Sequence, residues 1–103
     1  MEELTKHYLI SGRVQGVGYR RFAESRALEL NLRGWVRNLQ DGRVEALAQG
    51  PQNDLARFES YLKTGPAHGH VESLVVRSIA KPSTLDGFIV KKDSGEPWSE
   101  NYS

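Results

Sequence analysis

The chain changes from strand to helix within one short stretch, Gly12-Arg13-Val14-Gln15-Gly16-Val17-Gly18-Tyr19-Arg20. Before it, from His7 to Val14, one face of the alternating pattern carries Tyr8, Ile10, Gly12 and Val14, as in a strand with one buried side. After it, residues 20–30 carry apolar side chains at helical spacing. The glycines interrupt both periods, so the stretch predicts a tight loop between a strand and a helix.

The rest of the chain continues this alternation of strands and helices. Strands are predicted over 33–39 and 43–49, with the hairpin dipeptide Asp41-Gly42 between them. A second helix is predicted to start at Gly50-Pro51 and to end at Thr64-Gly65-Pro66, followed by strands over 71–79 and 87–91. The order βαββαβ, with a late extra strand, predicts an antiparallel sheet with both helices on one face. The expected fold class is therefore α+β, a ferredoxin-like sandwich.

The length of 103 residues is that of one domain. We expect a single domain over 1–103, with a core over about 5–92 and an extended tail over 93–103. The tail segment Ser94-Gly95-Glu96-Pro97 has no periodicity, which predicts a mobile terminus. His7 is expected on the solvent side of the first strand.

Composition excludes several classes of site and partner. Without cysteine there can be no disulfide, thiolate metal site or cysteine nucleophile. The net charge of +1 predicts no strong attraction to nucleic acid or to acidic membranes. The first residues lack a signal-peptide pattern, and no apolar run is long enough to span a bilayer, so a cytoplasmic protein is expected.

The glycine loop has the features of an anion site. Gly16 and Gly18 permit a backbone that turns successive N–H groups inward, and the following helix adds its positive N-terminal end. Arg20 can place a planar guanidinium on phosphate oxygens. The residues alone leave open a plain glycine turn with a surface arginine. Known nucleotide motifs are excluded, because a dinucleotide fingerprint needs glycine where Arg21 stands.

The loop stretch, followed by Gly34-Trp35-Val36-Arg37-Asn38, closely resembles the two signature segments of the acylphosphatase family. The resemblance covers residues 5 to 92, and the tail is longer than the family's usual ending. It implies hydrolysis of the carboxyl–phosphate bond of acyl phosphates to a carboxylate and inorganic phosphate, without metal or cofactor. It further implies that Arg20 binds substrate and Asn38 orients water, while backbone N–H groups of the loop hold the phosphate: Gln15, Gly16, Val17, Gly18, Tyr19 and Arg20.

Other functions share parts of this pattern. RNA-recognition domains have the same element order but stack bases on aromatic residues of the third strand, and the segment 43–49 has none. An anion sensor without catalysis, and the acylphosphatase-like domain of the hydrogenase-maturation carbamoyltransferase, are further alternatives. His68 and His70 are too few for a metal site. We expect a monomer whose partners are a small acyl phosphate and inorganic phosphate, with no nucleic acid and no membrane.

Overall fold

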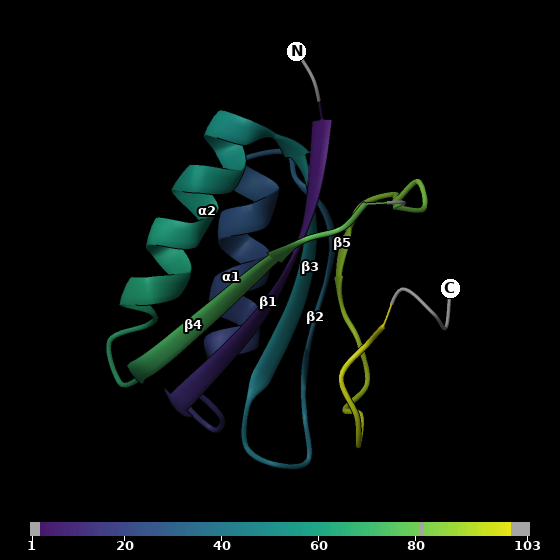
Figure 1. Cartoon of the computed structure of the whole chain (residues 1–103). Helices are drawn as coiled ribbons and strands as arrows, with labels where there is room; N and C mark the ends of the chain where they lie inside the picture. Colours follow the sequence, from purple (N-terminus) through teal and green to yellow (C-terminus); the bar gives the residue numbers. More distant parts are fainter. Residues whose placement is uncertain (1–2, 81, 100–103) are drawn as a thin grey trace.

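The computed structural model describes residues 3–80 and 82–99. Two helices cover one side of a single sheet, and the segment after the last strand runs along the other side (Figure 1). The elements confirm the predicted order, with ends that differ by a few residues: β1 Glu3–Arg13, α1 Tyr19–Glu29, β2 Arg33–Asn38, β3 Val44–Pro51, α2 Gln52–Thr64, β4 His70–Ser78 and β5 Phe88–Val90. In the described part of the chain, no helix is long and apolar enough to cross a membrane.

The sheet has the strand order β4-β1-β3-β2-β5. The pairs β1–β3, β1–β4 and β2–β3 are antiparallel, which confirms the predicted ferredoxin-like sandwich. The late strand β5 pairs in parallel with β2, in register from Gly34↔Phe88 to Val36↔Val90. The whole sheet is therefore mixed, and β2 lies between β3 and β5 rather than at an edge.

Residues with special backbone conformations end several of these elements. Asn31, two residues after the end of α1, has φ 56°, the left-handed conformation that commonly ends a helix. In the β2–β3 hairpin, Leu39 N–H donates to Arg43 O at 2.8 Å and Gly42 N–H donates to Leu39 O at 3.2 Å. Gly42 has φ 99°, so the hairpin has a three-residue loop with glycine at the left-handed position.

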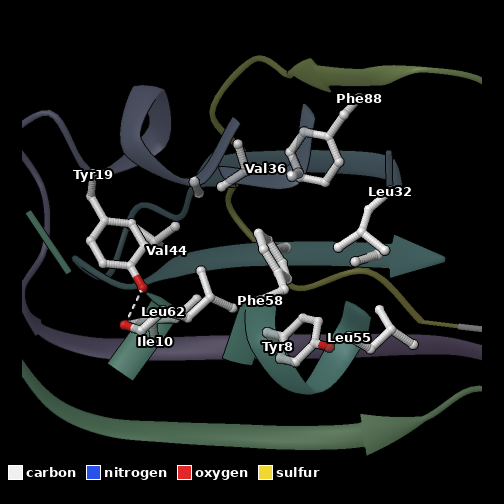
Figure 2. Close-up of a cluster of buried hydrophobic side chains, with 14 of the residues drawn as sticks. Tyr8, Ile10, Tyr19, Leu32, Val36, Val44, Leu55, Phe58, Leu62 and Phe88 are labelled. Carbon is white, nitrogen blue, oxygen red and sulfur yellow. Dashed lines mark hydrogen bonds between the residues drawn. The ribbon is translucent and has the colours of Figure 1, made fainter. Parts of the chain in front are cut away.

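The main hydrophobic core lies between the helices and the sheet (Figure 2). Phe58 of α2 packs edge-to-face against Tyr8 of β1 and Phe88 of β5, with ring centroids 5.7 and 5.9 Å apart. Figure 2 also shows the Tyr19 hydroxyl donating to Leu62 O, at 2.7 Å. Burial raises the pKa of the Tyr19 hydroxyl well above its usual value. This bond ties the start of α1 to the end of α2.

The opposite face of the sheet is also covered, which corrects two predictions. We call residues 91–98 the C-terminal strap. Trp98 of the strap packs on a second apolar cluster formed by Trp35, Leu47 and Ile79, so this part of the tail is docked rather than mobile. His7 is 3% exposed on the same face, not on a solvent side. Trp35 and Leu47 indicate in the sequence that this face is covered, because large apolar side chains grouped on one strand face are rarely left in water.

A buried carboxylate forms the polar centre of this second face. Glu45 is fully buried, and its oxygens lie 2.6 Å from His7 Nε2, from Arg37 Nε and from Trp98 N. Burial opposes ionisation of Glu45. The hydrogen bonds from His7, Arg37 and Trp98 outweigh that effect and hold the pKa of Glu45 below its usual value. The strap is thus held by a buried charge as well as by apolar packing.

Candidate active site

The loop between β1 and α1 has the conformation of an anion nest. Gly16 and Gly18 have φ 74° and 79°, in the left-handed region. A Cβ at either position would meet no atom within 4 Å, so glycine is favoured there by backbone conformation and not by space. In the described part of the chain, no backbone hydrogen bond uses an N–H group of residues 15–18. These donors are free for a ligand.

The start of α1 adds to the same site. Gly18 precedes the helix without any side-chain cap, and the first turn contains no acidic residue. The unpaired N–H groups and the positive end of the helix dipole are therefore not neutralised by the helix itself. A bound oxyanion would satisfy them.

Arg20 is the second residue of α1 and is partly exposed. Its Nη1 lies 3.2 Å from Oδ1 of Asp93 in the strap, an ion pair whose side chains are 39% and 61% exposed. An exposed pair of this kind contributes little stability. It does show that an oxyanion can reach the guanidinium.

Asn38, the last residue of β2, faces the same cleft. Its side chain is almost buried, with 8% exposure, and its Oδ1 has no hydrogen-bond partner among the described residues. Buried carbonyl oxygens nearly always have a donor, because leaving one unpaired costs about 1–3 kcal/mol. Asn38 Oδ1 is thus a buried acceptor whose hydrogen bond is not made within the described part of the chain.

A cavity of about 600 Å³ brings the loop and Asn38 together. Of the predicted site residues, Gly16, Gly18, Tyr19, Arg20 and Asn38 line it. Tyr19 is 1% exposed, with its ring in the core, so it contributes backbone rather than a stacking surface. The side chain of Val17 packs against the core.

The Gln15 side chain lies outside the cavity and has a separate role. Its Nε2 donates to Leu39 O at 2.8 Å and to Arg43 O at 2.9 Å, the two carbonyls that frame the β2–β3 turn. Gln15 therefore joins the anion loop to the hairpin that carries Asn38. Sequence reasoning missed this contact, because nothing in the local pattern indicates which distant carbonyls an amide will meet.

Two further walls of the cavity were also missed. Ile89 and Val90 of β5 line it and are 55% and 38% exposed, which gives one apolar side. Arg21 and Glu24 of α1 line a charged side. The sequence left the position of β5 undetermined, so this wall could not be assigned. In the described part of the chain, no three His, Asp or Glu side chains are grouped closely enough to hold a metal ion.

Fold and site together are typical of small ferredoxin-like α+β proteins that bind an oxyanion at a helix N-terminus. The family model described as Acylphosphatase matches residues 6–90. The acylphosphatase of Thermus thermophilus is 54% identical over 82 residues, which cover 80% of this chain and 92% of that protein. This chain belongs to the acylphosphatase family.

Solved structures give the same result. The crystal structure of acylphosphatase from Bacillus subtilis superposes with a TM-score of 0.83 at 38% identity, covering 85% of this chain and 98% of that one. A full-length HypF structure, in a phosphate- and nucleotide-bound form, also has a TM-score of 0.83, at 25% identity. The match covers 90% of this chain and 12% of that HypF chain.

Proposed function

We propose that this chain, which as a member of the acylphosphatase family hydrolyses the carboxyl–phosphate bond of acyl phosphates, does so by in-line attack of water. The N–H groups of residues 15–20 and the Arg20 guanidinium hold the phosphoryl group. Asn38 Oδ1 accepts a hydrogen bond from the attacking water and aligns it with phosphorus. The products are a carboxylate and inorganic phosphate.

The chemistry of the substrate fits so small a set of groups. The leaving carboxylate has a conjugate acid with a pKa of about 4 to 5, so it departs without a general acid. Phosphoryl transfer passes through a loose transition state, in which catalysis consists mainly of positioning and charge stabilisation. The loop and Arg20 stabilise the equatorial oxygens, and a phosphate oxygen of the substrate takes the proton from water.

The observation that carries the proposal is Asn38, which lines the same cavity as Arg20 and the open loop, and whose buried Oδ1 has no partner among the described residues. A protein that only binds phosphate has no use for an unpaired acceptor beside the anion, because an acceptor repels phosphate oxygens. An attacking water, which must donate a hydrogen bond, is the natural partner of this oxygen. This favours a hydrolase over an anion sensor.

The direct test is hydrolysis of benzoyl phosphate, whose ring would lie near the apolar Ile89 and Val90. We expect turnover that EDTA leaves unchanged, and poor turnover of phosphomonoesters because their alkoxide leaving groups are weak. No hydrolysis of benzoyl phosphate by folded protein would contradict the proposal. Loss of the activity in EDTA, with recovery on adding a divalent metal, would contradict the metal-free route.

We also infer a cytoplasmic monomer that has no nucleic-acid or membrane partner. The net charge of +1 supports the absence of nucleic-acid and anionic-membrane partners, since polyanion binding is favoured by an excess of basic residues. Sedimentation of the protein alone, with duplex RNA and with anionic vesicles would test it. Co-sedimentation with either polyanion, or a dimer at micromolar concentration, would contradict it.

A further inference from the structure

The C-terminal strap continues the parallel pairing of β5 along the end of β2. Lys91 N–H donates to Val36 O at 2.8 Å, Ser94 N–H donates to Asn38 O at 3.0 Å, and Gln40 N–H donates to Ser94 O at 3.0 Å. The carbonyl of Asn38 is therefore held by the strap. The neighbouring Leu39 pairs with β3 on the other side, through Arg43 O. The backbone at Asn38 is fixed from both sides.

The far end of the strap is anchored at a distance from the cavity. Trp98 N–H donates to the fully buried Glu45 carboxylate at 2.6 Å, and the Trp98 ring packs with Trp35 and Leu47. Glu45 follows Val44, the residue that pairs with Asn38 across the hairpin. It also binds Arg37, the residue before Asn38, at 2.6 Å. One carboxylate thus holds the strap and the strand that carries Asn38.

The strap also contains an irregularity beside the cavity. The pairing offset between β2 and its parallel partner increases by one residue between Val36↔Val90 and Leu39↔Ser94. Extra residues of this kind redirect side chains and are frequent next to active sites. Here the segment 91–93 ends at Asp93, whose carboxylate reaches Arg20. The strap therefore touches both predicted catalytic residues.

We propose that the C-terminal strap positions Asn38 for the reaction, with Ser94 N–H and the Glu45 carboxylate as its two positioning groups. This inference rests on the proposed role of Asn38 in orienting water. Releasing the strap would leave the Asn38 carbonyl unpaired and free the end of β2, while the loop keeps its place and Arg20 loses only its exposed ion pair with Asp93. Turnover would suffer far more than phosphate binding.

A double-mutant cycle with Asn38→Ala tests the proposal. Ser94→Pro removes the N–H group that holds Asn38, whereas Ser94→Ala keeps it and controls for the lost hydroxyl. We expect Ser94→Pro to lower kcat for benzoyl phosphate by about tenfold or more, since a misplacement of about 1 Å can cost about 10². The loss in Ser94→Ala is expected to be much smaller, and phosphate affinity is expected to stay within a few fold in both. Added to Asn38→Ala, Ser94→Pro should cause little further loss, because both act on one group.

The outcomes separate this inference from the proposed function. Full kcat in Ser94→Pro, or a loss that simply multiplies with that of Asn38→Ala, overturns the positioning role and leaves the proposed function standing. Full kcat in Asn38→Ala itself overturns the proposed function. If Ser94→Pro does not fold, Glu45→Gln, which keeps every N–H group of the strap, goes through the same cycle with the same criteria. Of the two tryptophans, Trp35 lies in the cluster under the strap and Trp98 lies in the strap itself, so their fluorescence reports whether the strap is docked.

Discussion

The two walls of the cavity that carry the predicted catalytic residues, Arg20 and Asn38, are built in different ways. In one wall, Gly16, Gly18 and Arg20 come from one short loop and the first helical turn, and most of their contribution is backbone N–H. In the other wall, Asn38 is a single side chain at the end of β2. Its backbone is held by Ser94 of the strap, and the turn after it is held by Gln15 of the loop.

The difference shows which parts of a site depend on local sequence. A nest at a helix N-terminus needs glycine in two positions and an uncapped helix, so a few adjacent residues are sufficient. The placement of Asn38 depends on contacts from β3, the loop and the strap, which only the folded chain brings together. We therefore expect changes in the loop wall to affect binding and turnover, and changes around Asn38 to affect turnover alone.

The largest effect is expected from Arg20→Ala. The variant loses the bidentate cation in the ground state and in the transition state, so turnover of benzoyl phosphate should fall by about 10³ to 10⁵. Arg20→Lys should also be poor, because an ammonium does not reproduce the planar fork. Arg21→Ala, beside it in the same cavity, is the matched control and should lose far less. Equal losses in steady-state kinetics of the two alanine variants would mean that general positive charge, not Arg20, binds the phosphate.

Asn38→Ala should have the next largest effect and a different character. It removes the acceptor that aligns water, so kcat should fall by about 10² or more, as for one preorganised polar group. KM should change little. Steady-state kinetics with benzoyl phosphate measure this, with tryptophan fluorescence to verify that the variant is folded. A variant with normal kcat would remove the basis for a water-orienting role.

Glu45→Gln tests, through the free energy of unfolding, whether the buried Glu45 carboxylate stabilises the strand end that carries Asn38. Removing one partner of a buried ion pair costs about 3 kcal/mol, and we expect that order of loss at neutral pH. Because the pKa of Glu45 is lowered in the native state, its stabilisation is complete above the unfolded value of 4.5 and is lost as the pH falls below it. Urea unfolding from pH 7 to pH 3 measures both effects. The difference between wild type and Glu45→Gln should shrink towards acid pH, and a constant difference would contradict the assignment.

Gln15→Met tests the hydrogen bonds that connect the anion loop to the hairpin carrying Asn38. Methionine keeps the length of the side chain but cannot donate to Leu39 O and Arg43 O. We expect kcat to fall by about tenfold, because a small displacement of a catalytic group is costly, while phosphate affinity changes little. The matched control is Gln40→Met, an exposed position in the same turn. If both variants behave alike in kinetic assays, the Gln15 bonds do not position the hairpin.

The smallest effect is expected from Glu24→Gln. Glu24 is the carboxylate of α1 that lines the cavity, so it is the obvious alternative as general base. With a substrate oxygen taking the proton, kcat should stay within a few fold and its pH profile should keep its shape. General bases contribute about 10² to 10⁴ in rate. A loss of that size, with disappearance of an acidic limb from the pH–kcat profile, would assign the proton to Glu24.

Much of the fold could be predicted because its signals are local. The alternation of Tyr8 and Ile10, the glycines of the loop and the left-handed Asn31 each determine one element or its end. The position of β5 could not be predicted, since three residues with no partner pattern fit either edge of the sheet. The docked strap was missed because Trp98 lies in a segment without periodicity, and its partners Trp35 and Leu47 are distant in sequence.

The candidate site divides in the same way. The Arg20 side of the cavity follows from one contiguous motif, and the place of Asn38 at the end of its strand follows from the second motif. The unpaired state of Asn38 Oδ1, the Gln15 bonds and the apolar wall at Ile89 and Val90 follow only from tertiary structure. The burial of His7 could have been suspected from the apolar residues on the same face. Its partner, Glu45, could not have been identified from the sequence.

The most direct test asks whether Arg20 binds the phosphate while Asn38 orients the water. It combines calorimetric titration of inorganic phosphate into folded Arg20→Ala and Asn38→Ala with steady-state kinetics of the same variants. The account predicts that Arg20→Ala loses phosphate binding together with turnover. It predicts that Asn38→Ala binds phosphate within a few fold of the wild type while its kcat falls by about 10² or more. If Asn38→Ala binds phosphate as weakly as Arg20→Ala, Asn38 is a ligand of the phosphate and does not act by orienting water.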